Sequence, residues 1–355
     1  MRADLALAGF GHVGRRFATL LAERRDRLAA DDDLDARIVG ISTGRHGGAW
    51  RDEGVDVARA IDAVERGESL PSPAGAAAPA STFDLIARLG RSTADLRILI
   101  ETTLLDIRAG QPAIDHVRAA IAAGCHVATA NKGPAAFAYA DLRDAARERG
   151  VSFLFEGAVM DGIPVFNLVR ETLPVVDILG FRGVVNSTTN HILSALEDGD
   201  EFAPALARMQ QLGIAEADPS LDVDGWDAAA KTAALANVLM DARTTPHAVR
   251  RTGLDSGSAA LARRAIAQGR RLRLVASAER SANGAVEATV APVELPATDL
   301  LAGLRGQANA VVLRTDLLGE IAICQLDGSL TQTAYALLSD VVTIRKRAGR
   351  GAPLR

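Results

Sequence analysis

The segment Gly9-Phe-Gly11-His-Val-Gly14 constrains the fold more than any other feature, because it joins an apolar run at residues 5–8 to an amphipathic stretch at 13–27. Three glycines at this spacing allow a tight turn, a close approach of the backbone to a pyrophosphate, and close helix–strand packing. The N-terminus of the following helix would add N–H donors and a positive partial charge. The segment therefore predicts a dinucleotide site, the alternative being a glycine-rich turn with no ligand.

The rest of the first half alternates apolar runs with amphipathic segments. We expect strands at residues 37–41, 96–100, 126–129 and 151–155, and helices at 113–123 and 135–149. This βα alternation predicts an α/β domain with a doubly wound, Rossmann-type parallel sheet. The Pro- and Ala-rich residues 71–80 are expected to form a mobile surface loop inside that domain.

The pattern changes after Gly157. Strands are expected at residues 178–186, 285–292, 310–313 and 320–324, and helices at 189–197 and 227–240, which together predict an α+β domain. A final amphipathic helix at 331–347 could pack back on the first domain. The expected division is a dinucleotide-binding domain at 1–157, completed by 331–355, and a second, α+β domain at 158–330.

Composition excludes several classes of protein. Forty basic residues face 44 acidic ones and aromatic residues make up 4% of the chain, so neither a general nucleic-acid binder nor a single-strand stacking platform is expected. The chain has no apolar run near the ~20 residues of a membrane span. Cys125 and Cys324 show no metal or disulfide spacing, so we expect two small core residues in a cytoplasmic protein.

The end of the second strand should reveal the choice of nucleotide. A site for NAD usually carries a carboxylate there, whereas this chain has Ser42, Thr43 and Arg45. Two hydroxyls and a guanidinium can bind a 2′-phosphate. The pattern favours NADP, with NAD still possible, and the alternative for Arg45 is an ordinary solvated arginine.

Residues 211–231 carry five carboxylates in a turn-rich run that leads into a helix: Glu216, Asp218, Asp222, Asp224 and Asp227. Their spacing does not match a calcium-binding EF-hand loop, and the alternative to a site is simple surface charge. Asp227 and Lys231 are four residues apart and can pair on one helix face. Clustered carboxylates suit a cationic group such as the ammonium of an amino acid.

Lysine is rare in this chain, at three of the 40 basic residues. An amine can release a proton when its surroundings lower its pKa, whereas arginine in practice cannot. Lys231 follows the acidic run, Lys132 follows a strand of the nucleotide domain, and Lys346 lies in the arginine-rich final helix. Lys231, beside the carboxylates, therefore suits a reaction that moves a proton to or from an oxygen, and Lys132 lies where open α/β sheets bind ligands.

Two further segments offer polar groups. Residues 186–190, Asn-Ser-Thr-Thr-Asn, present hydroxyls and amides, the alternative being pure capping of the helix that follows. Residues 156–164 join the two domains, and their turn could present carbonyl oxygens to a cation.

Taken together, these motifs resemble the homoserine dehydrogenase family over nearly the whole chain. The resemblance rests on GFGHVG, ATANKGP, FEGAVMDGIPV, GVVNSTTNHIL, GIAEADPSLDVDGWDAAAK and the final helix, in that order. It implies reduction of aspartate β-semialdehyde to homoserine with NAD(P)H, in threonine and methionine biosynthesis, by a homodimer. It also implies that residues 158–330 form a substrate-binding and dimerisation domain.

The resemblance also implies residue roles. Lys132 and Lys231 would lie at the reacting oxygen as proton donors or acceptors. Glu216, Asp222 and Asp227 would hold the ammonium of the substrate and orient Lys231, while Thr188 and Ser187 would contact the substrate. A monovalent cation, Na⁺, would lie near Glu156, Val159, Asp161 and Ile163, largely on backbone oxygens. The cofactor would contact Gly9, Phe10, Gly11, His12, Val13, Gly14, Ser42, Thr43, Arg45, Thr102, Asn131 and Lys132.

The chain departs from the family pattern at several positions. Ser187 replaces a glycine, Ile214 stands where tyrosine is usual, and His191 stands where tyrosine or phenylalanine is usual. A related NADP-dependent dehydrogenase for a modified amino-acid semialdehyde or an amino alcohol therefore stays open, as does a non-catalytic NADP-binding paralogue. The sequence leaves no room for the regulatory domain of longer members, so we expect little inhibition by threonine.

Overall fold

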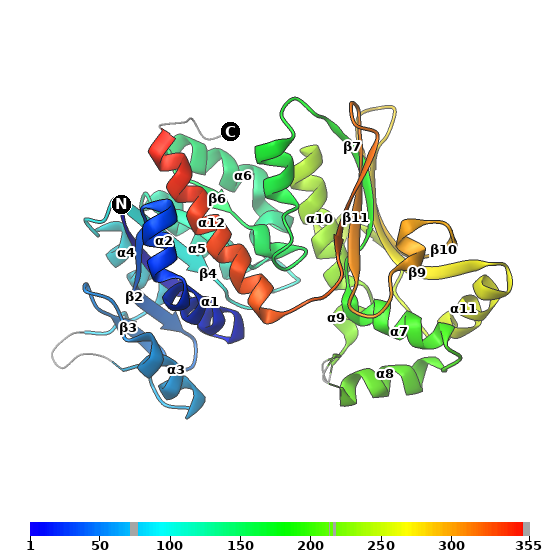
Figure 1. The fold of residues 1–355 in the computed structure, drawn as a ribbon, viewed down its shortest axis with the longest axis horizontal. Coiled ribbons are helices and arrows are strands. Elements are labelled where there is room, and N and C mark those ends of the chain that lie inside the picture. The colour runs from blue at the N-terminus through cyan, green and yellow to red at the C-terminus, as the bar shows by residue number, and fades with distance from the viewer. Residues whose placement is uncertain (72–76, 213, 216–217, 351–355) are drawn as a thin grey trace. The chain divides into compact units, whose positions relative to one another are not determined.

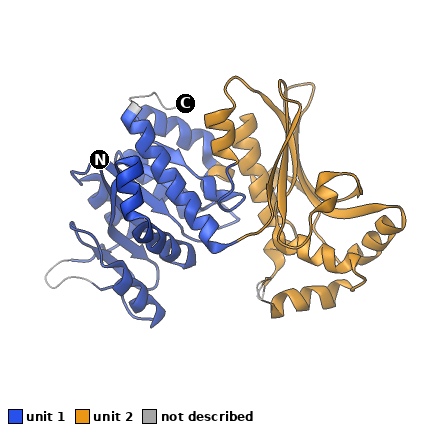
Figure 2. Ribbon diagram, in the orientation of Figure 1, with its two compact units in different colours: residues 1–134, 138–164, 329–355 blue, residues 135–137, 165–328 orange. Residues whose placement is uncertain are grey.

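The computed structural model describes residues 1–71, 77–212, 214–215 and 218–350 (Figure 1). Figure 2 shows two compact units: unit 1 comprises residues 1–134, 138–164 and 329–355, and unit 2 comprises 135–137 and 165–328. The sequence expectation placed the division at 157/158 and 330/331. Residues 72–76 of the expected surface loop lie outside the described residues.

Unit 1 is built on a six-stranded sheet with the order β3-β2-β1-β4-β5-β6. All neighbouring strands run parallel except β2 and β3, which are antiparallel. The strands are β1 Arg2–Ala8, β2 Asp35–Thr43, β3 Gly47–Trp50, β4 Leu96–Glu101, β5 His126–Thr129 and β6 Phe153–Leu154. The Rossmann-type sheet predicted from the βα alternation is confirmed.

Helices surround this sheet in unit 1. They are α1 His12–Glu23, α2 Arg25–Asp32, α3 Val57–Glu65, α4 Thr82–Gly90, α5 Ala113–Ala122, α6 Gly133–Arg149 and α12 Leu330–Arg350, with a short 3-10 turn at Glu156–Ala158. The helix expected at 13–27 is two helices, because the backbone of Arg24 leaves the helical region. The break lets Leu28 of α2 join the core of unit 1.

The final helix contributes to the core of unit 1. Leu337, Val341 and Ile344 of α12 are fully buried in the cluster that contains Leu5 and Leu7 of β1. In Figure 1, α12 (red) lies beside α1 and α2 (blue), so the two ends of the chain share one core.

Unit 2 contains a second six-stranded sheet, with the order β12-β11-β7-β9-β10-β8. Its pairs are antiparallel except for β8 and β10. The strands are β7 Ile178–Val184, β8 Arg250–Arg251, β9 Arg270–Arg280, β10 Val286–Pro296, β11 Asn309–Thr315 and β12 Glu320–Gln325. The expected α+β domain is confirmed, although β7 ends two residues before the predicted Asn186, which instead caps the next helix.

The helices of unit 2 are α7 Ser187–Glu197, α8 Phe202–Gln211, α9 Ser220–Val223, α10 Trp226–Met240 and α11 Ser258–Ala267, with a π-helical turn at Leu168–Thr172 and 3-10 turns at Pro246–Ala248 and Leu300–Gly303. Cys125 of unit 1 is buried as expected, but Cys324 is exposed on the edge strand β12. No helix in the described part of the chain has the length and hydrophobicity needed to cross a membrane.

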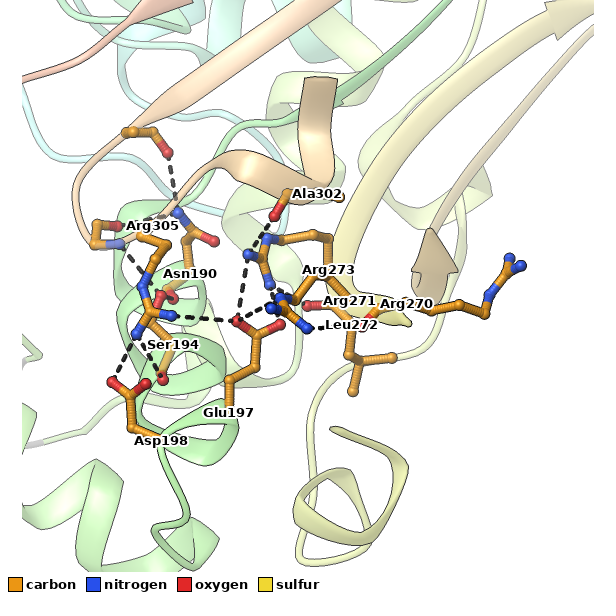
Figure 3. Close-up of polar contacts among 12 residues, drawn as sticks. Asn190, Ser194, Glu197, Asp198, Arg270, Arg271, Leu272, Arg273, Ala302 and Arg305 are labelled. Carbon is orange, nitrogen blue, oxygen red and sulfur yellow. Dashed lines mark hydrogen bonds and ion pairs between the residues drawn. The ribbon is translucent and has the colours of Figure 1, made fainter. Parts of the chain in front are cut away.

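A buried ion pair fastens α7 to the sheet of unit 2 (Figure 3). Glu197, at the end of α7, accepts from the Arg273 guanidinium of β9 at 2.7 Å, and both side chains are almost fully buried. Arg273 also donates to the carbonyls of Leu272 and Ala302, at 2.7 and 2.6 Å. A buried pair needs such extra hydrogen bonds, because the desolvation of two charges is costly.

Candidate active site

The glycine motif forms the turn between β1 and α1. Gly9 has φ +95°, and a Cβ there would lie 2.8 Å from the main-chain carbon and oxygen of Thr102. A Cβ at Gly14 would lie 2.9 Å from the main-chain oxygen of Gly9. Gly11 is exposed, and a Cβ there would meet nothing within 4 Å. Two glycines are therefore required by packing, while the third leaves open space where a ligand can approach.

The N-terminus of α1 begins at this turn. Its N-cap is Gly11, no side chain caps it, and His12 in the first turn is exposed. Phe10 is buried and Val13 is half-buried against the core of unit 1. An uncapped helix N-terminus with positive partial charge suits an anion, so the turn fits the pyrophosphate of a dinucleotide.

The end of β2 carries the three residues expected to select the nucleotide. The buried Ser42 hydroxyl lies 3.0 Å from the Thr82 hydroxyl. The Thr43 hydroxyl accepts from the His46 N–H at 2.7 Å and donates to the Gly47 carbonyl at 3.2 Å. Arg45 is exposed and makes no ion pair with a residue in the described ranges. Arg45 is thus the member of this set that presents its polar group to solvent.

The ends of β4 and β5 hold Thr102, Asn131 and Lys132. Thr102 donates from its hydroxyl to the Gly9 carbonyl at 3.0 Å. The Asn131 amide donates to the carbonyls of Thr103 and Leu104 at 2.9 and 3.2 Å, and its oxygen accepts from the Gly133 N–H at 2.8 Å. Lys132 lies between Asn131 and Gly133, half-buried at the N-cap of α6. Asn131 therefore fixes the backbone on which Lys132 is carried.

The turn expected to bind a cation follows β6. The N–H of the buried Glu156 donates to Oδ2 of Asp340 at 3.0 Å, and Asp161 accepts from the Thr333 hydroxyl at 3.0 Å with φ +48°. Both partners come from α12. Val159 is buried and Ile163 is half-buried. The described residues include no group of three His, Cys, Asp or Glu side chains that could hold a metal, so a cation here needs main-chain oxygens.

In unit 2, α9, α10 and the N-cap of α7 bring three of the predicted residues together. The Lys231 ammonium lies 3.0 Å from Oδ2 of Asp227, as the four-residue spacing predicts, and donates to the Val185 carbonyl at 2.6 Å. The Asn186 amide donates to Oδ1 of Asp222 at 2.6 Å and to Oδ2 of Asp227 at 3.0 Å. One amide therefore links both carboxylates, and through Asp227 it links them to the lysine.

Sequence reasoning missed Asn186 as a member of this network. Its oxygen accepts from the Thr189 N–H at 2.9 Å and caps α7, which the sequence did predict as one alternative. Its nitrogen binds carboxylates 36 and 41 residues further along the chain. A capping signal is local, so it carries no information on such distant partners.

The other residues predicted to bind the substrate are Thr188, Ser187 and Glu216. Thr188 is buried, with its hydroxyl 3.4 Å from the Ile214 carbonyl, and Ser187 is half-buried in the first turn of α7. Glu216 lies outside the described residues. His191, one turn further along α7, is half-buried, and this burial lowers its pKa.

Comparisons with known proteins agree along the chain. A family model described as homoserine dehydrogenase matches residues 164–342, and one described as its NAD-binding domain matches residues 9–156. The chain is 36% identical over 348 residues to an NAD(+)-dependent homoserine dehydrogenase of Pseudomonas canavaninivorans, covering 98% of this chain and 97% of that protein.

Solved structures give the same picture. A homoserine dehydrogenase from Thiobacillus denitrificans is 29% identical with a TM-score of 0.82, covering 99% of this chain and 75% of that one. A hyperthermophilic archaeal homoserine dehydrogenase in complex with NADPH is 27% identical with a TM-score of 0.76, covering 99% of both chains.

Proposed function

The chain belongs to the homoserine dehydrogenase family, and from this premise we propose how its own residues carry out the reaction. The family is one of oxidoreductases in amino-acid biosynthesis that use a nicotinamide nucleotide. The reaction is the interconversion of L-homoserine and L-aspartate 4-semialdehyde. The observation that carries the residue assignment is the network of Asn186, Asp222, Asp227 and Lys231 in unit 2.

Unit 1 would hold the nucleotide at the glycine turn. The open space at Gly11 and the uncapped N-terminus of α1 fit its pyrophosphate. Thr102, Asn131 and Lys132, at the carboxyl ends of β4 and β5, lie where open α/β sheets bind ligands. When bound, the reduced nicotinamide supplies the hydride that the aldehyde carbon receives.

Lys132 and Lys231 would act at the oxygen of the aldehyde. As hydride arrives at carbon, negative charge grows on this oxygen, and two ammonium groups stabilise that charge while one supplies the proton. Asp227 at 3.0 Å and the Val185 carbonyl at 2.6 Å hold the Lys231 amine in a fixed position. In the direction of homoserine oxidation, a neutral lysine takes the proton, so activity should rise at alkaline pH.

The carboxylates of Asp222 and Asp227, with Glu216, would hold the ammonium of the amino-acid substrate. Asn186 supports this role because its amide donates to both Asp222 and Asp227 and keeps them side by side. Two like charges held together favour a bound cation. Thr188 and Ser187, at the start of α7, would contact the rest of the substrate.

The chain would prefer NADP to NAD, with NAD as a possible second cofactor. The support is the lack of a carboxylate at residues 42–45 and the exposed guanidinium of Arg45. Relatives of both kinds exist, since one is named NAD(+)-dependent and another is in complex with NADPH. Comparing the KM values for NADPH and NADH tests this choice, and a clear preference for NADH would refute it.

A monovalent cation, Na⁺, would bind the turn at Glu156, Val159, Asp161 and Ile163. Main-chain oxygens suit a hard cation. The buried Asp340 carboxylate adds negative charge nearby. Thermal unfolding in NaCl against choline chloride, at equal ionic strength, should show a higher Tm with Na⁺, and equal values would contradict the site.

We also propose a cytoplasmic homodimer that pairs through the sheet of unit 2. The strand register places Val293, Ala322 and Cys324 on one face of that sheet, and all three are exposed. Exposed small and apolar residues on one sheet face are typical of an interface. Sedimentation should give twice the chain mass, and Ala322→Arg should give monomers. A monomeric wild-type protein would refute the pairing.

The direct test of the substrate is oxidation of NADPH with aspartate β-semialdehyde, run beside other amino-acid semialdehydes. The highest kcat/KM is expected for aspartate β-semialdehyde. Asp222→Asn should raise its KM, because one of the carboxylates that hold the ammonium loses its charge. A higher kcat/KM for another amino-acid semialdehyde would identify that compound as the substrate. Nucleotide binding without turnover of any substrate would refute an enzymatic role.

A further inference from the structure

Glu101 is the last residue of β4 and has a fully buried side chain, at 0% exposure. Its Oε1 accepts from the Thr103 N–H at 3.1 Å and also contacts the Thr103 hydroxyl. Its Oε2 lies 3.0 Å from the Thr129 hydroxyl. Nδ1 of the buried His116 lies 3.6 Å from Oε1. A carboxylate is costly to bury, so its place at this edge of the sheet calls for a reason beyond packing.

A chain of hydrogen bonds leads from Glu101 to the backbone on either side of Lys132. The Thr129 hydroxyl, fully buried, can donate to Oε2 or to the main-chain oxygen of Glu101, both at 3.0 Å. The same hydroxyl accepts from the Asn131 N–H at 3.0 Å. Asn131 then accepts from the Gly133 N–H at 2.8 Å. The backbone on both sides of Lys132 is therefore fixed by groups that begin at one carboxylate.

The same segment reaches the glycine turn. Thr102, which follows Glu101, donates from its N–H to the Ala8 carbonyl at 2.8 Å and from its hydroxyl to the Gly9 carbonyl at 3.0 Å. Residues 101–104 thus contact both the turn that fits the pyrophosphate and the loop that carries Lys132. A shift of this segment would displace the amine relative to the nucleotide.

We propose that Glu101 is a positioning residue, which acts through Thr129 and Asn131 to hold the Lys132 amine in its productive place. The inference rests on the proposed function, in which Lys132 acts at the reacting oxygen. A carboxylate suits the position because it only accepts hydrogen bonds, and N–H and O–H donors converge on it. An amide would direct its own N–H₂ group at one of these donors.

The test compares Thr129→Val and Glu101→Gln with wild type in kcat, KM and nucleotide Kd. Valine keeps the shape of threonine but removes the hydroxyl link. Both variants should lower kcat about tenfold or more while the Kd for NADPH changes less than about threefold, because misplacement of a catalytic group acts on the chemical step. Thr315→Val is the matched control, since this buried threonine also bonds a carbonyl, at 3.0 Å, but lies on β11.

A double variant separates a positioning role from a general loss of structure. If Glu101 acts through Lys132, then adding Thr129→Val to Lys132→Ala should lower kcat little further, whereas independent effects would multiply. Multiplying losses would overturn the proposal, as would kcat values within about twofold of wild type for both single variants. Wild-type turnover in Lys132→Ala alone would refute the proposed function itself, which is a different outcome. If Glu101→Gln fails to fold, Thr129→Val still decides.

Discussion

His126 should make the free energy of unfolding of unit 1 depend on pH. It is the first residue of β5, and its Nδ1 accepts from the Ser152 N–H at 3.0 Å, beside the bond from the Val127 N–H to the Ser152 carbonyl at 2.8 Å. Burial, and then the positive charge of Arg97, lower the pKa of His126 from 6.5 to about 4. Protonation of Nδ1 would also remove the acceptor that Ser152 uses.

The direction of the pH effect follows from comparing the pKa of His126 in the folded and the unfolded chain. The unfolded chain has the higher pKa for this group, so it binds the proton more readily, and stability falls as pH drops through 6.5 and levels off near 4. One pKa unit corresponds to about 1.4 kcal/mol, so the full loss is about 3–4 kcal/mol, and about three quarters of it is reached by pH 4.5.

The assay is urea unfolding of wild type and His126→Asn at pH 7.5 and 4.5. Asparagine can still accept from the Ser152 N–H but does not titrate, and the other titrating groups are common to both proteins. Trp50 lies in unit 1 and reports its unfolding once Trp226 is replaced by Phe in both proteins. The free energy of unfolding should fall by about 2–3 kcal/mol more in wild type than in the variant. Equal losses would refute the reasoning.

Three further substitutions have defined outcomes. Arg45→Ala should raise the KM for NADPH about tenfold or more and leave that for NADH nearly unchanged, because a charged hydrogen bond to the phosphate is lost; equal changes would count against the role. Lys231→Arg should lower kcat on the order of 10²-fold with the fold intact by circular dichroism, and near-normal turnover would disprove proton transfer there. Glu197→Gln should lower the free energy of unfolding, measured in urea, by about 3–5 kcal/mol, because Arg273 is left buried and unpaired; a loss below about 1 kcal/mol would contradict this.

Much of the fold could be predicted because hydrophobic periodicity and glycine spacing are local signals. The strand at His126–Thr129 and the helix that begins near Trp226 follow directly from such patterns. The long strand β9 was missed, because Arg271 and Arg273 interrupt its apolar pattern. Arg273 is nevertheless fully buried, and the carboxylate that makes this possible lies on α7, 76 residues earlier.

The candidate site also combines contacts that the sequence could predict with contacts that it could not. The pairing of Asp227 with Lys231 was predictable, because a four-residue spacing fixes both on one helix face. The roles of Asn186 and Glu101 were not, since each bonds residues that only the folded chain brings near. Ser42 shows the opposite case, because its hydroxyl looked available in sequence but faces Thr82 in the structure.

The order of the two units along the chain has a consequence for biosynthesis. Residues 165–328 of unit 2 are continuous and leave the ribosome before α12, whose Leu337, Val341 and Ile344 fill the core of unit 1. The nucleotide-binding unit therefore stays incompletely folded, with part of its apolar core exposed, while the other unit is synthesised. Folding of the segment made first is completed by the segment made last, so this interval is when the nascent chain most needs protection from aggregation.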